Sequence, residues 1–204
     1  RDRNLVSMSP VMREAINEAT DVFSRGHDPQ EIDIILDKAC YKDMITAAEE
    51  NEDEFLIGLI RLNIDILNLK TFVRLKEMDK PWSFFQKVFL GGGNISEQFF
   101  ISCYEEPFAQ IADKLAPYGL KEVMAEGGKA IKADRDFSVI ERLCENKMMD
   151  YNRRAKYETF GIGPIVGYWY AKEAEIDNLR IILNGIVVGL EPDEIIERLR
   201  EPYV

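Results

Sequence analysis

Two helix-like stretches of the sequence could carry polar chemistry, because each holds an acid, an amide and a base at the same spacing. The stretches are 110 positions apart, and the residues are Asp65, Asn68 and Lys70 in the first and Glu175, Asn178 and Arg180 in the second. If such a helix is packed on several sides, these groups cannot all reach water. They then either contact a partner protein or form an internal network that fixes the register of the helix.

Two glycine-rich motifs resemble nucleotide-binding loops but lack required residues. "EGGKA" (126–130) has neither the earlier glycine of a phosphate-binding loop nor a serine or threonine after the lysine. In "GIGPIVG" (161–167) the third glycine is one position late for a dinucleotide-binding loop, and no strand precedes it. We interpret both as loops that end helices.

Metal and nucleophile chemistry is also poorly supported. His27 is the sole histidine, which excludes a multi-histidine metal site and makes a catalytic triad improbable. The acids of "AAEENEDEF" (47–55) lack the spacing of a calcium loop and fit a solvated connector. A magnesium-dependent helical enzyme using Asp134 and Asp136 is the weakest alternative. The sequence therefore predicts no catalytic, cofactor-binding or metal-binding residues.

The composition is that of an acidic, soluble, globular protein. The chain has 204 residues, 46% of them hydrophobic, and a net charge of −11. Such a charge repels phosphate backbones and anionic headgroups, which excludes nucleic acid and direct lipid insertion as expected partners. The longest apolar run is about half of a membrane span. Three widely spaced cysteines indicate thiols in a reducing cytoplasm.

The elements that would position these residues are helices. Asp28 with Pro29 has the pattern of a helix start, and Pro192 with Glu194 repeats it near the end of the chain. Asn94 with Glu97 is expected to open another helix. Strand signals are scarce, so the sequence predicts an all-α protein of roughly ten to twelve helices.

The two stretches predict two similar helical units, at residues 1–97 and 98–204. The second helix should bury a face made of large residues: Ile176, Leu179, Leu183 and Ile186. It also carries a face of small residues that would let a neighbouring helix approach closely: Ala171, Ala174, Asn178 and Gly185. Units of about 100 residues with matching helices are typical of repeat architectures.

The sequence from Phe160 to Val204, including "GPIVGYWY", "EIDNLR" and the final "LREPYV", resembles the C-terminal segment of the V-type/A-type ATP synthase C subunit, which is named d in eukaryotic vacuolar ATPases. "LGGGNIS" and "IDILNLKTFVRLK" resemble its middle segment. The resemblance implies an all-helical, funnel-like, pseudo-threefold architecture of three similar units. The chain would hold the last two units and lack the first, as a fragment would.

The resemblance further implies a non-catalytic central-stalk protein that couples the rotor shaft to the membrane proteolipid ring during ATP-linked proton or sodium transport. Its expected partners are the shaft subunits and the ring. Its expected location is the cytoplasmic face of the membrane, where other subunits hold it. A generic helical-repeat adaptor that binds another soluble partner is the alternative.

Overall fold

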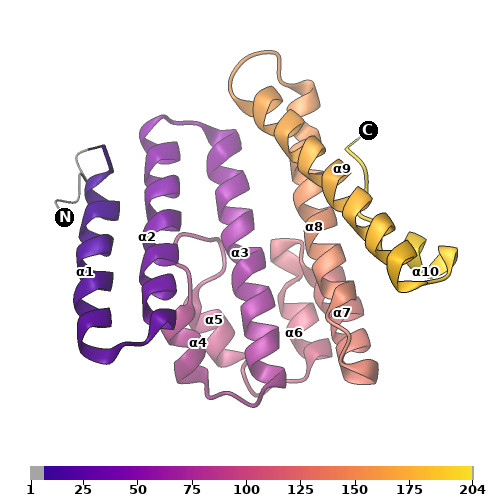
Figure 1. Cartoon of the computed structure of the whole chain (residues 1–204), viewed down its shortest axis with the longest axis horizontal. Coiled ribbons are helices and arrows are strands. Elements are labelled where there is room, and N and C mark those ends of the chain that lie inside the picture. Colours follow the sequence, from indigo (N-terminus) through magenta and orange to yellow (C-terminus); the bar gives the residue numbers. More distant parts are fainter. Residues whose placement is uncertain (1–6, 204) are drawn as a thin grey trace. The chain divides into compact units, whose positions relative to one another are not determined.

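The computed structural model describes residues 7–203, and within this range the protein is all-α, as predicted. Ten α-helices and two short 3₁₀ segments follow one another, and no strand occurs among the described residues (Figure 1). In chain order they are α1 (Pro10–Gly26), α2 (Pro29–Glu50), α3 (Glu54–Glu77), α4 (Trp82–Val88), α5 (Glu97–Ser102), α6 (Phe108–Lys114), η1 (Ala116–Tyr118), α7 (Lys121–Asp134), α8 (Ser138–Asn152), η2 (Arg153–Tyr157), α9 (Gly163–Val188) and α10 (Pro192–Arg198).

The chain divides into two compact units, and the division falls between Tyr104 and Glu105. The sequence placed the end of the first repeat at residue 97. The structure keeps α5 in the first unit because Phe100, on this short helix, is fully buried against the ring of Phe72 on α3.

In the first unit, α1, α2 and α3 lie side by side and alternate in direction (Figure 1). The side chains of Ser9, Asp28 and Asp53 each accept a hydrogen bond from a backbone N–H in the first turn of the helix that follows. Asp28 caps α2 with Pro29 at its first turn, which confirms the sequence prediction. The short connections between these helices favour the antiparallel arrangement.

The core of the first unit is built around α3, which is the helix with most buried residues. Phe72 is fully buried, and its ring lies 5.6 Å from that of Phe85 on α4, 5.3 Å from that of Phe100 and 5.5 Å from that of Tyr104. Such edge-on and tilted aromatic contacts add to the burial of apolar area. They hold α4 and α5 against α3.

In the second unit, the "EGGKA" glycines lie inside α7 rather than in a loop that ends a helix, which corrects the sequence interpretation. A Cβ atom at Gly127 would lie 2.6 Å from Cβ of Ile140 on α8, and one at Gly128 would lie 2.7 Å from Cβ of Phe108 on α6. The two glycines are therefore required by the close packing of α7 between its neighbours.

The Gly127→Ala variant should lose about 1–3 kcal/mol of unfolding free energy, because the added methyl group overlaps Ile140. Urea unfolding followed by circular dichroism measures the loss. Gly26→Ala is the matched control: Gly26 ends α1 with nothing within 4 Å of its Cβ position, so this change should be neutral or slightly stabilising. Equal stability of both variants would show that α7 and α8 can separate at little cost.

The second glycine-rich stretch begins a helix instead of ending one, so that interpretation is also corrected. Gly161 has φ +96° in the loop, and α9 starts at Gly163. At the other end, Glu191 and Glu194 form a capping box around Pro192, and α10 follows as predicted.

The small-residue face of α9 packs inside the second unit. A Cβ atom at Gly167 would lie 2.9 Å from Cβ of Ala155, and one at Gly185 would lie 2.7 Å from Cγ1 of Ile195 on α10. The close approach that the sequence predicted for this face is confirmed at Gly185.

Candidate functional site: asparagine clamps and the outer face of α9

Asn68 on α3 holds the chain where α4 ends. The side chain is buried, its Nδ2 donates to the Leu90 carbonyl at 2.8 Å, and its Oδ1 accepts from the Leu90 N–H at 2.9 Å. Both polar groups of one backbone residue are thus satisfied by one amide. We call this pair of hydrogen bonds an asparagine clamp.

Asn178 on α9 makes the same clamp in the second unit. Its Nδ2 donates to the Arg200 carbonyl at 3.0 Å, and its Oδ1 accepts from the Arg200 N–H at 2.8 Å. In both units the clamped residue follows the asparagine by 22 positions. Each asparagine therefore fixes the same kind of backbone segment in its own unit.

The backbone around each clamp also matches. The residues that precede α4 and α10, Pro81 and Glu191, have φ and ψ of −67° and 147° and of −66° and 149°. The residues that follow these helices, Phe89 and Leu199, have −57° and 132° and −65° and 148°. Each helix has seven residues, so the clamps close two turns of the same length and shape.

Asp65 binds the glycine-rich loop of the first unit. Its Oδ2 accepts from the N–H and Nδ2 of Asn94 at 3.1 and 2.8 Å, and its Oδ1 accepts from the N–H of Ile95 at 2.9 Å. A Cβ atom at Gly93 would overlap this carboxylate. Burial raises the pKa of Asp65, and the three hydrogen bonds oppose that rise.

The prediction that Asn94 opens a helix is wrong. Because Asn94 is bound to Asp65, α5 begins later, at Glu97, and Ser96 is its cap. The hydroxyl oxygen of Ser96 accepts from the N–H of Phe99 at 3.2 Å.

The remaining residues of the expected polar network lie apart from the clamps. Glu175 is exposed and pairs with Lys172 at 2.7 Å, while Arg180 pairs with Asp177 at 3.0 Å, and both pairs are three positions apart on α9. Lys70 is half-buried. Exposed pairs of this kind contribute little to stability. The structure thus brings Asp65, Asn68 and Asn178 onto backbone groups of their own units and leaves Glu175 and Arg180 at the surface.

The acidic clusters do not assemble into a metal centre within residues 7–203: no group of three or more histidines, cysteines or acids there is placed to hold an ion. Asp136 accepts from the N–H of Ser138 at 2.8 Å and from its hydroxyl at 2.9 Å, and these bonds hold the pKa of Asp136 below its ordinary value. This carboxylate shapes the start of α8. No described helix is both long and apolar enough to cross a bilayer.

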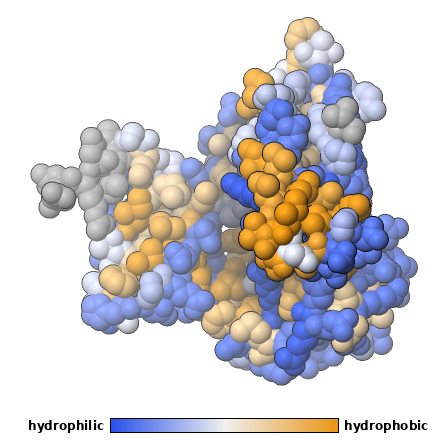
Figure 2. All heavy atoms as spheres, turned by 45° about the vertical axis from the view of Figure 1, so that its right-hand side comes forward, coloured by the Kyte–Doolittle hydropathy of each residue, from blue (hydrophilic) through white to orange (hydrophobic). Residues whose placement is uncertain are grey.

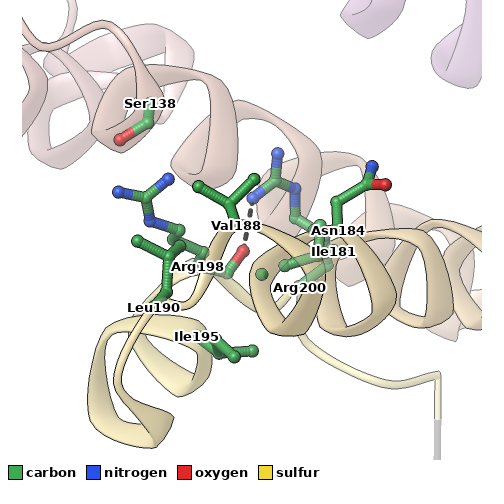
Figure 3. A pocket seen from close by; sticks show the side chains of 9 residues that line it. Ser138, Ile181, Asn184, Val188, Leu190, Ile195, Arg198 and Arg200 are labelled. Atoms are coloured by element: carbon green, nitrogen blue, oxygen red, sulfur yellow. Dashed lines mark hydrogen bonds between the residues drawn. The ribbon is translucent and has the colours of Figure 1, made fainter.

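A pocket of about 350 Å³ lies between α9 and α10, beside Ser138 (Figure 3). Aliphatic side chains and two arginines line it: Ile181, Val188, Leu190, Ile195, Arg198 and Arg200. The Arg200 guanidinium donates to the Arg198 carbonyl at 2.7 Å and also pairs with Glu145. Ser138, Asn184 and Gly185 complete the lining, which holds no thiol, imidazole or carboxylate among the described residues.

The large apolar residues of α9, predicted to be buried, are exposed, and this prediction is wrong. Their exposed fractions are 43% for Ile176, 58% for Leu179, 61% for Leu183 and 63% for Ile186. Hydrophobic side chains gather on this part of the molecule's surface (Figure 2). The helix has two nonpolar faces, and the small one packs inside the unit because it lets Ile195 approach the backbone of α9.

Over the described residues these features define a class of protein: it is all-helical, its buried polar side chains bind mainly its own backbone, and its second unit presents an apolar surface. Comparison with known sequences then gives the family. Residues 3–198 match the ATP synthase (C/AC39) subunit family of A/V-type ATPases, and the chain belongs to that family.

Individual relatives agree with this assignment. The chain is 28% identical to the C subunit of the A-type ATP synthase of Archaeoglobus fulgidus, over 85% of this chain and 49% of that protein. It is 22% identical to the C subunit of the V-type sodium ATPase of Enterococcus hirae, over 97% of this chain and 60% of that protein. The chain thus spans about half the length of the curated relatives that it matches.

Proposed function

We propose that this protein is a non-catalytic central-stalk component of a rotary A/V-type ATPase. It couples the rotor shaft to the proteolipid ring during ATP-linked transport of protons or sodium ions, on the cytoplasmic face of the membrane. The observation that carries the proposal is the family match over residues 3–198. The names of the relatives, which are subunits of an ATP synthase and of a sodium ATPase, support it.

The physical properties of the chain are compatible with this role. A protein that transmits torque must resist bending, and helices held by aromatic contacts and by buried hydrogen bonds supply stiffness. The net charge of −11 favours docking onto basic protein surfaces and disfavours anionic lipid.

We also propose that the two stretches are copies of one helical unit, with the repeats at residues 1–97 and 98–204, in a pseudo-threefold, funnel-like architecture. The matching asparagine clamps and the matching backbone around α4 and α10 support this part. An experimental structure of the chain in which the two units do not superpose around the clamps would contradict it.

Reconstitution tests the function. The protein is mixed with purified rotor-shaft subunits of an A/V-type ATPase and, separately, with ring-containing membranes stripped of the ATP-hydrolysing head. We expect binding to both at low salt, partial loss of binding at about 1 M salt, where surface charges are screened, and no ATP hydrolysis above background. An acidic protein of similar size and charge serves as the control for nonspecific attachment.

Two results would overturn the assignment. Failure to bind both the shaft and the ring at low salt would favour the helical-repeat adaptor. ATP hydrolysis that co-purifies with the protein would contradict a non-catalytic role.

A further inference from the structure

After α10 the chain leaves helical structure, and side chains from other elements of the second unit hold it in place. We call residues 200–203 the strap. Asn178 of α9 holds Arg200 in the clamp described above. The Oδ1 atom of Asn146, on α8, accepts from the N–H of Glu201 at 3.0 Å. The strap is therefore tied to two helices through its backbone.

Arg153, in η2, binds the strap at two further points. Its Nη1 donates to the Glu201 carboxylate at 2.9 Å, and its Nη2 donates to the Pro202 carbonyl at 2.6 Å. The Tyr203 side chain lies against α9, where its hydroxyl oxygen would be 2.8 Å from a Cβ atom at Gly167. The strap thus joins three elements of the second unit, α8, η2 and α9.

Water can reach the ion pairs that hold the strap. The side chains of Arg153 and Glu201 are 30% and 49% exposed, and Arg153 also pairs with Asp150 at 2.7 Å. Arg200 pairs with Glu145, whose side chain is 44% exposed. Exposed ion pairs contribute little to stability, and salt screens them. The strap is therefore held by several contacts that are individually weak.

The first unit holds the corresponding segment by buried groups. Counting back 110 positions, Arg200 corresponds to Leu90. The buried Asn68 clamps Leu90, and the buried carboxylate of Asp65 accepts from the N–H of Ile95. Neither contact pairs opposite charges, so salt should affect both of them little. A segment held by exposed contacts opens at a lower free energy than one anchored in a core.

We propose that the strap is a reversible latch that opens and closes while α8 and α9 stay folded. In the closed state it ties α8, η2 and α9 together. Opening breaks the contacts with Asn146 and Arg153 and uncovers the surface of α9 at Gly167. Salt shifts the latch toward the open state because it weakens the ion pairs of Arg200 and Glu201. The proposal concerns the second unit alone and does not depend on the proposed function.

Amide hydrogen exchange of the whole chain, followed by NMR, tests the latch. The N–H groups of Arg200 and Glu201, which the two asparagines bind, report opening of the strap. The N–H of Leu183, inside α9, reports unfolding of the helix. Each rate is divided by the rate in an unstructured peptide of the same sequence under the same conditions. After this correction, we expect the two strap amides to exchange at least about 100-fold faster than the Leu183 amide.

Salt and one substitution test the part played by the ion pairs. Raising salt from about 0.05 M to about 1 M should speed exchange of the strap amides at least about twofold and leave the Leu90 amide unchanged. Glu201→Gln removes the charge that Arg153 binds and should speed strap exchange about two- to fivefold. Glu197→Gln, at an exposed position of α10 outside the strap, is the matched control and should leave the exchange unchanged.

Three results would overturn the proposal. Strap amides that exchange at the corrected rate of Leu183 would show that the strap opens only when α9 unfolds. Strap amides that exchange as fast as the unstructured peptide would show that no closed state forms. Exchange that salt or Glu201→Gln does not accelerate, or that Glu197→Gln accelerates equally, would show that the ion pairs do not hold the strap. If Glu201→Gln changes the circular dichroism, the salt dependence of the unchanged protein decides.

Discussion

Replacing Asn68 by leucine should lower the unfolding free energy of the first unit by about 2–5 kcal/mol. Leucine is close to asparagine in size, so little packing changes. The substitution instead leaves the N–H and the carbonyl of Leu90 without the partners that hold them at 2.9 and 2.8 Å. Each unsatisfied buried group costs about 1–3 kcal/mol.

The equivalent change in the second unit should cost less. Asn178 is half-buried, so water can reach the freed groups of Arg200, and we expect a loss of about 1–3 kcal/mol. Asn184→Leu, at an exposed position of the same helix, is the matched control and should change stability by less than about 0.5 kcal/mol.

The two tryptophans allow the units to be measured separately, which matters because two units need not unfold in one step. Trp82 begins α4 in the first unit, and Trp169 lies on α9 in the second. Urea unfolding is followed by fluorescence in a Trp169→Phe background for Asn68→Leu and in a Trp82→Phe background for Asn178→Leu. If Asn68→Leu is as mild as Asn184→Leu, the clamp does not stabilise the fold.

The sequence singled out the two asparagines but did not predict the hydrogen bonds of the clamps. Asn68 and Asn178 stood out because they are identical at an offset of 110 within two helices that share a pattern of apolar and charged residues. Nothing in the sequence marks Leu90 and Arg200 as their partners, because each asparagine binds only the backbone atoms of its partner. A side chain that binds backbone can be located by its own pattern, whereas its target can be of any residue type.

Helix starts were predicted where the local sequence alone decides them. Asp28 with Pro29 and Pro192 with Glu194 act within one turn, so neighbouring residues suffice. Asn94 also had the composition of a cap, but the buried carboxylate of Asp65 binds it from 29 positions away. Tertiary contacts of this kind override local preference and cannot be read from a short window.

Tertiary packing also explains why the glycines of α7 and the buried face of α9 were predicted wrongly. Glycines suggest loops, yet Gly127 lies within a helix because Ile140 packs directly against its backbone. On α9, hydrophobicity alone favoured burying Leu179 and Leu183. Packing instead selected the face of Gly185, where close approach is sterically possible.

Replacing Asp65 by leucine should have the largest effect of all, a loss of about 3–6 kcal/mol of unfolding free energy in the first unit. The carboxylate accepts three hydrogen bonds, two from backbone N–H groups and one from the Asn94 amide. Leucine offers none, so the loop at 91–95 loses its anchor to α3 and buried donors are left unpaired. Asp53→Asn, which keeps the oxygen that caps α3, is the control and should cost less than about 1 kcal/mol.

The pH dependence of stability should identify the charge state of Asp65, with Asp65→Asn as the reference because it cannot ionise. Burial raises the pKa of Asp65 in the folded state above its unfolded value of about 3.9, so the folded protein binds the proton more tightly. The stability of the unchanged protein relative to Asp65→Asn is then greatest below pH of about 4. It falls as pH rises through the folded-state pKa and stays constant above it.

Urea unfolding of both proteins across this range, with the difference plotted against pH, measures the effect. A difference that grows with pH would mean that the hydrogen bonds from Asn94 and Ile95 outweigh burial and stabilise the ionised carboxylate.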